Sequence, residues 1–327
     1  MLAVAAALIC PAPSSADEGG ISFWLPGLNG SLAAVPGVPG PSFTALYYYT
    51  SLSAGGGKTF ELGGKIVGGL GGQANLAAFG PTYTFATPVI GAQLSVSLLG
   101  IAGASTASVD ATLTGPFGRS ISGSRSDEIG GFGDLIPQAA LKWNKGVNNF
   151  MTYVTGDIPA GNYSSNRLAN LGIGHAAIDG GGGYTYLNPA TGREFSAALG
   201  LTYNFENMTT HYQNGVDLHL DWGASQFLSK QFLVGIVGYV YAQISPDGGA
   251  GATLGSFESR VLGIGPQIGY MFPIGSAAQG YINLKGYKEF AAQNRPDGWN
   301  LWLTMVITPA PPHHENAQAL LFPTGQR

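Results

Sequence analysis

The feature that most constrains this chain is a repeated alternation of apolar and polar residues along segments of about ten residues. In residues 194–206, Phe195 and Leu199 fall on one face, while Glu194 and Thr202 fall on the other. Successive side chains of a β-strand point to opposite sides, so this pattern predicts a strand with one apolar and one polar face. The same alternation recurs in residues 134–144, 215–225, 281–289 and 299–307. We therefore expect an all-β chain.

Composition decides which kind of all-β protein fits. A soluble β-sandwich also alternates, but it needs charges for its solvent face. Only 10% of the 327 residues are charged, against about 25% in soluble domains, which favours an apolar face turned toward lipid. A closed barrel satisfies every backbone hydrogen bond there. The chain has a net charge of −4 and no basic block, so we expect no nucleic-acid partner.

The connections support a transmembrane antiparallel β-barrel of about 12 strands. Short and longer links alternate along the chain, which is typical of outer-membrane barrels with short periplasmic turns and longer outer loops. The expected strands cover residues 41–53, 72–86, 89–103, 128–144, 147–158, 178–187, 192–206, 213–227, 231–245, 257–272, 276–290 and 297–308. Residues 58–70 and 105–114 could each form another strand, which would give 14.

The two ends differ from the barrel in composition. Residues 1–16 are apolar and end in small residues, which predicts a signal peptide cleaved before Asp17. The only cysteine, Cys10, lies in this segment, where a lipid anchor is an alternative, so the mature chain would have no disulfide. Residues 17–40 are rich in Pro and Gly and predict a periplasmic arm or a plug in the lumen. Residues 41–308 would form the barrel, and residues 309–327 a disordered tail.

Motifs for catalysis or nucleotide binding are incomplete. The GGGKT run at residues 55–59 would need a glycine at position 52 to make a phosphate-binding loop, and that position is Leu52. Asp217, His219 and Asp221 share one strand face, but alternate residues lie about 6.6 Å apart with parallel side chains. This favours a polar ladder that lines water, with a metal site or catalysis as alternatives. We predict no cofactor, no metal and no enzyme activity.

The polar faces of the strands and several tyrosines give a candidate set of lumen-facing residues along a solute path. Acids and bases of opposite sign within this set would form ion pairs across the wall, and the tyrosines would offer stacking surfaces where they face inward. Plain packing of the wall is the alternative role for all of them. The set comprises Asp134, Lys142, Tyr184, Tyr186, Glu194, Glu206, Asp217, His219, Asp221, Arg260, Lys285, Tyr287 and Glu289.

A run of motifs in order carries a resemblance to a known family. The motifs are SFWLPG at residues 22–27, SLAAVP at 31–36, AIDGGGGYTYLNPATGREFSAALGLTYNFEN at 177–207, YQNGVDLHLDWGASQFLS at 212–229, GIGPQIGYMFP at 263–273 and NRPDGWNLWLT at 294–304. Together they resemble the MetA-pathway of phenol degradation family of outer-membrane transporters, from about residue 20 to residue 308. The resemblance implies an outer-membrane barrel that admits hydrophobic or aromatic compounds, and it carries over no binding residues.

These observations predict a porin-like channel in the outer membrane of a Gram-negative bacterium. Its partners would be outer-membrane lipid and small hydrophobic or aromatic solutes, which would cross by passive diffusion. Two alternatives stay open at this point: a structural or adhesive barrel without transport, and an outer-membrane enzyme that acts on lipid. The oligomeric state is not fixed by the sequence.

Overall fold

The computed structural model describes residues 22–53, 59–62, 65–68, 70–114, 120–253, 256 and 258–311. The predicted signal peptide and most of the predicted C-terminal tail lie outside these residues. Among the residues described, no helix is long and apolar enough to cross a membrane.

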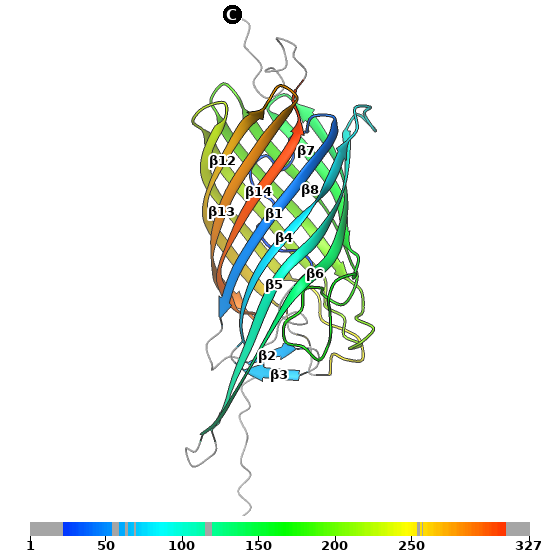
Figure 1. The fold of residues 1–327 in the computed structure, drawn as a ribbon, viewed down its shortest axis with the longest axis vertical. Coiled ribbons are helices and arrows are strands. Elements are labelled where there is room, and N and C mark those ends of the chain that lie inside the picture. Colours follow the sequence, from blue (N-terminus) through cyan, green and yellow to red (C-terminus); the bar gives the residue numbers. More distant parts are fainter. Residues whose placement is uncertain are drawn as a thin grey trace, which may run out of the picture.

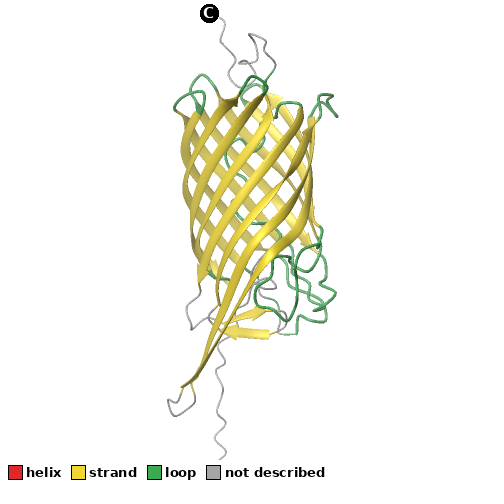
Figure 2. Ribbon diagram, viewed as in Figure 1, coloured by secondary structure: helices red, strands yellow, loops and turns green. Residues whose placement is uncertain are grey.

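The described strands form one closed antiparallel barrel and one small separate sheet (Figures 1 and 2). Twelve strands make up the barrel, and β14 pairs with β1 to close it, as in the pair Tyr48 and Trp302. This confirms the predicted fold class. The elements are β1 (Gly40–Ser53), β2 (Thr59–Leu62), β3 (Lys65–Gly68), β4 (Leu70–Thr84), β5 (Gln93–Thr114), β6 (Ser120–Lys145), β7 (Asn148–Asp157), β8 (Ala177–Asn188), β9 (Arg193–Asn204), β10 (Asp217–Phe227), β11 (Phe232–Gln243), β12 (Arg260–Ile274), β13 (Ala278–Gln293) and β14 (Asp297–Pro309).

The alternative count of 14 barrel strands is wrong. Residues 58–70 contain β2 and β3, which pair only with each other as a separate two-stranded sheet. Residues 105–114 continue β5 without a break, because the ladder with β6 runs on past Ala107 and Asp127. The β5–β6 hairpin therefore projects well beyond the barrel rim (Figure 1). Its Ser- and Thr-rich sequence lacks the apolar alternation by which strands inside the bilayer are detected.

The barrel wall turns apolar side chains outward, and on β9 and β10 its inner face is polar. On β9, the outward Phe195, Leu199 and Leu201 are 43%, 50% and 47% exposed, whereas the inward Glu194 and Thr202 are 4% and 0% exposed. A soluble protein would have the reverse arrangement. This distribution suits a wall surrounded by hydrocarbon.

The two ends of the barrel differ in their connections. The end that holds the start of β1 and the end of β14 also holds tight turns, such as the two-residue turn between β6 and β7 at residues 146–147. Short turns mark the periplasmic end in this class of barrel. The opposite, outer end carries the projecting β5–β6 hairpin and the longer loops that follow β7, β9 and β11. The β7–β8 loop (residues 158–176) is the longest of these three loops.

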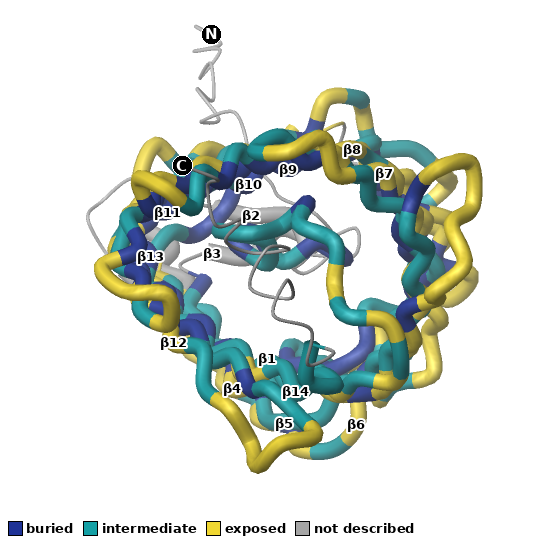
Figure 3. The backbone as a smooth tube through the Cα atoms, turned by 90° about the horizontal axis from the view of Figure 1, so that it is seen from above, coloured by how far each residue is buried: buried dark blue, intermediate teal, exposed yellow. Residues whose placement is uncertain are grey.

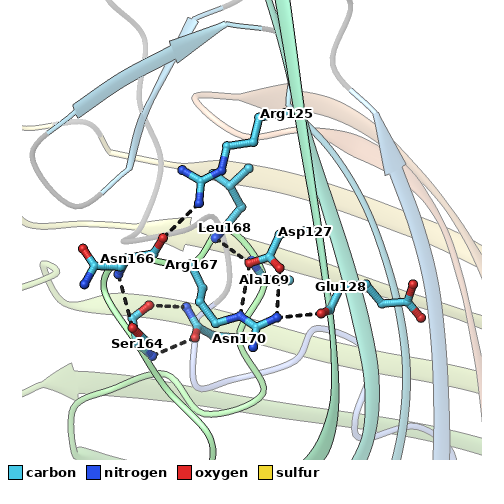
Figure 4. A network of polar contacts seen from close by, with 9 residues as sticks. All are labelled: Arg125, Asp127, Glu128, Ser164, Asn166, Arg167, Leu168, Ala169 and Asn170. Atoms are coloured by element: carbon cyan, nitrogen blue, oxygen red, sulfur yellow. Dashed lines mark hydrogen bonds and ion pairs between the residues drawn. The ribbon is translucent and has the colours of Figure 1, made fainter.

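The β7–β8 loop is fastened to the projecting part of β6 by an ion pair (Figure 4). The guanidinium of Arg167 donates to both carboxylate oxygens of Asp127, at 2.9 and 3.2 Å. The backbone N–H groups of Leu168 and Ala169 donate to the same carboxylate. The hydrogen bond from Arg167 is the largest cause that lowers the pKa of Asp127 to about 2. Because the folded pKa is depressed, the fastening is complete above about pH 4 and is lost only as the pH falls through 2.

We expect Asp127→Asn to raise the rate of tryptic cleavage after Arg167 several-fold at pH 8. The amide has no charge and one acceptor fewer, so the loop would open more often. Timed digestion of detergent-solubilised protein with mass spectrometry of the fragments measures this rate. Glu128→Gln is the matched control, because the Glu128 side chain is exposed and only its backbone carbonyl accepts from Arg167. Equal cleavage rates in all three proteins would contradict this role of Asp127.

Candidate functional site

Residues 22–39 lie inside the barrel lumen, as the view down the axis shows (Figure 3). Two oppositely charged side chains hold the first part of this segment. The carboxylate of Asp221 on β10 accepts from the backbone N–H groups of Gly27 and Asn29, both at 2.9 Å. The ammonium of Lys285 on β13 donates to the carbonyls of Gly27, Leu28 and Asn29, at 2.7, 2.9 and 3.2 Å. The acid and the base thus bind N–H and C=O groups of neighbouring peptides, and both poles of the peptide that joins Leu28 to Asn29.

A second acid holds the next part of the segment. The carboxylate of Glu194 on β9 accepts from the backbone N–H of Leu32 at 2.9 Å and from the hydroxyl of Ser31 at 2.5 Å. On β8, the hydroxyl of Thr185 accepts from the N–H of Ala34 at 3.0 Å. These bonds satisfy backbone donors that have no strand partner. The segment is therefore fixed in register along the inner faces of β8, β9, β10 and β13, and we call it the plug.

Gly27 lies against the wall at Tyr287 of β13. Its φ of +86° is unfavourable for residues with a side chain, and a Cβ there would lie 2.8 Å from the ring of Tyr287. The hydroxyl of Tyr287 also donates to the Gly27 carbonyl at 3.4 Å. Glycine is thus required here for two independent reasons.

Trp24 covers the polar ladder predicted on β10. Its indole stacks on the imidazole of His219 with 3.7 Å between ring centroids and 13° between planes. The Nε2 atom of His219 lies 2.7 Å from the Asp179 carboxylate on β8, and Asp217 accepts from the side-chain amide of Asn204 at 2.9 Å. Among the described residues, no group of three or more His, Cys, Asp or Glu side chains is placed to hold a metal ion.

Nine of the thirteen predicted residues point into the lumen. They are Asp134, Lys142, Glu194, Asp217, His219, Asp221, Lys285, Tyr287 and Glu289. Five of these nine hydrogen-bond to the plug: Lys142, Glu194, Asp221, Lys285 and Tyr287. The sequence predicts ion pairs between members of this set, but each described pair that involves a member joins it to a residue outside the set. His219 pairs with Asp179, and Glu289 lies 4.0 Å from Arg295. Lys142 and Lys285 instead donate to plug carbonyls. These two lysines, like Asp221 and Glu194, thus find their partners in the plug backbone rather than in side chains of opposite charge.

For Tyr184 and Tyr186 the prediction of a lumen-facing position is wrong. They alternate with Thr185, which is fully buried and binds the plug, so both tyrosines lie on the outer face of β8. Tyr184 packs there against Phe150, with 5.5 Å between ring centroids. The preceding run of four glycines carries no apolar or polar alternation, and a shift of one residue moves every side chain to the opposite face. The inward residues of β8, including Asp179, were missed for the same reason.

Glu206 and Arg260 also lie outside the lumen, contrary to the prediction. Glu206 follows the end of β9 in an exposed loop, where its carboxylate lies 3.0 Å from His211. Arg260 is the first residue of β12 and is exposed, while its neighbour Val261 is buried inside. In both cases the alternation was extended to the very end of a strand, where the pleat no longer fixes the direction of the side chain.

The other side of the lumen is open and mainly apolar. A cavity of about 380 Å³ lies between the plug and the inner faces of β1, β4, β5, β6, β7 and β14. Its polar lining includes Asp134, Lys142 and Asp157. Its apolar lining includes Leu25, Leu28, Leu46, Leu76, Ala78, Leu99, Ile101, Ile136, Leu171, Ile173, Trp302 and Val306.

A second cavity of about 90 Å³ continues this space toward the outer end. It reaches Leu168 in the β7–β8 loop and Arg295 beside the start of β14. Both cavities are lined by Trp24, Leu25, Tyr48 and Leu76, together with Ser22. Leu25, Tyr48 and Leu76 therefore lie where the smaller, outer chamber adjoins the larger, inner chamber.

Comparison with known proteins identifies the family. The family described as "Putative MetA-pathway of phenol degradation" matches residues 56–305, well over half of the chain. The chain belongs to this family. The resemblance seen in the sequence is thereby confirmed. No curated protein matches the chain.

One solved structure agrees with the fold of this chain. The COG4313 outer membrane channel from Pseudomonas putida is 15% identical, with a TM-score of 0.63 over 84% of this chain and 98% of that chain. A FadL homologue from Pseudomonas aeruginosa is 10% identical, with a TM-score of 0.38 over 91% of this chain and 97% of that one; a score this low carries no weight. The lipid-facing wall and the family place the protein in the outer membrane of a Gram-negative bacterium, as predicted.

We expect Asp221→Ala to lower the free energy of unfolding by about 2 to 4 kcal/mol, since it leaves the buried N–H of Gly27 and the partly buried N–H of Asn29 without their acceptor. Urea unfolding in detergent micelles, followed by tryptophan fluorescence, measures the loss. Glu258→Gln is the control, because Glu258 is an exposed carboxylate near the outer rim. A loss no larger than that of the control would contradict the anchoring role of Asp221.

Proposed function

We propose that this protein lets small hydrophobic or aromatic molecules cross the outer membrane passively, along the apolar side of its lumen. The observation that carries the proposal is the division of the lumen. The plug fills the side lined by β8 to β13, while two adjoining apolar cavities occupy the side lined by β1, β4, β5 and β14. A path of this kind accepts apolar solutes and offers little to hydrophilic ones.

The size and lining of the inner chamber support this assignment. Small-molecule sites are usually concave, mostly apolar and of about 300–1,000 Å³, and the inner chamber has about 380 Å³. Porins that conduct hydrophilic solutes have a polar, water-filled interior instead. The name of the family refers to phenol degradation, which is consistent with an aromatic solute.

The two alternative functions have less support. An enzyme that acts on lipid needs its catalytic side chains at the lipid boundary, but His219 is fully buried under Trp24 inside the lumen. A structural or adhesive barrel would use the outer loops as its working surface and has no need of two adjoining apolar chambers. Single-channel recording and solute uptake separate this last alternative from transport.

We expect Leu76→Trp to reduce uptake of toluene at least about threefold, because the indole would fill the space where the two chambers adjoin. Uptake of radiolabelled toluene is measured in cells that lack the chromosomal gene and express wild type or variant from a plasmid. Leu201→Trp is the matched control, since Leu201 lies on the lipid-facing side of β9. Equal uptake with wild type and with empty plasmid would count against transport as a whole.

A further inference from the structure

One of the two carboxylates that line the inner chamber differs from the other in its hydrogen bonds. Asp157, the last residue of β7, is 6% exposed, and its Oδ2 atom has no hydrogen-bond partner among the described residues. Asp134 lines the same chamber, but its two oxygens accept from the backbone N–H groups of Gly161 at 2.7 Å and Ile173 at 2.8 Å. Asp134 therefore holds the β7–β8 loop, whereas Asp157 is left with a free acceptor.

The surroundings of Asp157 do not supply the missing donor. Thr155 faces the chamber from the same strand, but its hydroxyl donates to the carbonyl of Pro137 at 2.9 Å. The same chamber is also lined by Ile136, Leu171 and Ile173, whose side chains are apolar. A buried acceptor without a partner is costly and uncommon in native proteins. An occupant of the chamber with an O–H or N–H group would remove that cost.

Two other side chains that line the inner chamber carry a polar atom without a partner. The indole N–H groups of Trp24 and Trp302 are buried and unbonded within the described part of the chain, and both side chains line the inner chamber. The chamber thus combines a large apolar surface and flat aromatic walls with a few separate polar points. This combination fits a mainly apolar molecule with a single small polar group rather than a sugar or an ion.

We propose that Asp157 is the hydrogen-bond acceptor of a binding site for small apolar molecules that carry one hydroxyl, such as phenols and alcohols. The inference rests on the proposed function of the lumen as a solute path and adds the class of solute. The site prefers such a molecule to the same molecule with its hydroxyl methylated, because the methyl ether cannot donate to Asp157.

Binding of p-cresol and of 4-methylanisole to the full-length protein in detergent micelles tests this preference. Isothermal titration calorimetry gives both affinities, with protein-free micelles as the blank. We expect wild type to bind p-cresol at least about tenfold more tightly than 4-methylanisole. Asp157→Leu should bind both compounds about equally. The control Gln138→Leu changes another polar residue of the same chamber and should keep the preference. No preference in wild type, or an unchanged preference in Asp157→Leu, would overturn the assignment.

A measurement on wild type alone covers the case in which Asp157→Leu does not fold. In crystals soaked with 4-bromophenol, the anomalous signal of bromine locates the ligand, and we expect its hydroxyl within hydrogen-bond distance of the Asp157 carboxylate. A bromophenol bound elsewhere in the lumen, with only water on Asp157, would overturn the site. Toluene uptake distinguishes the two proposals. If toluene is taken up but p-cresol binds no more tightly than 4-methylanisole, only the role of Asp157 is contradicted. If toluene is not taken up, the proposed function is contradicted.

Discussion

The requirement that every backbone N–H and C=O inside a bilayer find a partner within the protein governs this structure. An open sheet would leave two unpaired edges in hydrocarbon, so the first and last strands of the sheet must meet. Pairing of β1 with β14 achieves this over eleven consecutive residue pairs, from Phe43 with Ile307 to Ser53 with Asp297. Closure then makes one face of every strand lipid-facing and the other lumen-facing. The alternation in the sequence follows from that division.

Closure also creates a difficulty that the plug resolves. The inward carboxylates and the two inward lysines are enclosed by the wall, and a buried charge is costly unless it is hydrogen-bonded. Asp221, Glu194 and Lys285 find their partners in the backbone of residues 27–32. The plug backbone in turn gains acceptors and donors that no neighbouring strand provides. Because these groups gather on β9, β10 and β13, the plug lies on one side, and the apolar chambers remain on the other.

The sequence predicts the barrel well because alternation, low charge and regular connections all report the same physical constraint. The predicted ranges of β9 and β14 differ from the observed ones by two residues or fewer at each end. The assignment of side chains to the inner or outer face fails where the residues are neither clearly apolar nor polar, as in the four glycines before Tyr184. It also fails at strand ends such as Arg260. The partners of Asp221 and Lys285 could not be predicted, because they are backbone groups almost 200 residues or more away in sequence. The free acceptor of Asp157 is a property of its surroundings and leaves no sequence pattern.

The division of the lumen is the central claim, and thiol labelling of single-cysteine variants tests it most directly. The mature chain predicted here has no cysteine, since Cys10 lies in the predicted signal peptide. We expect the apolar reagent N-ethylmaleimide to label Leu46→Cys and Leu99→Cys, which line the inner chamber, much faster than Ser225→Cys, whose hydroxyl lies 2.7 Å from Ser31 of the plug. Equal labelling of all three positions, or faster labelling at Ser225→Cys, would contradict a lumen that is filled on its polar side and open on its apolar side.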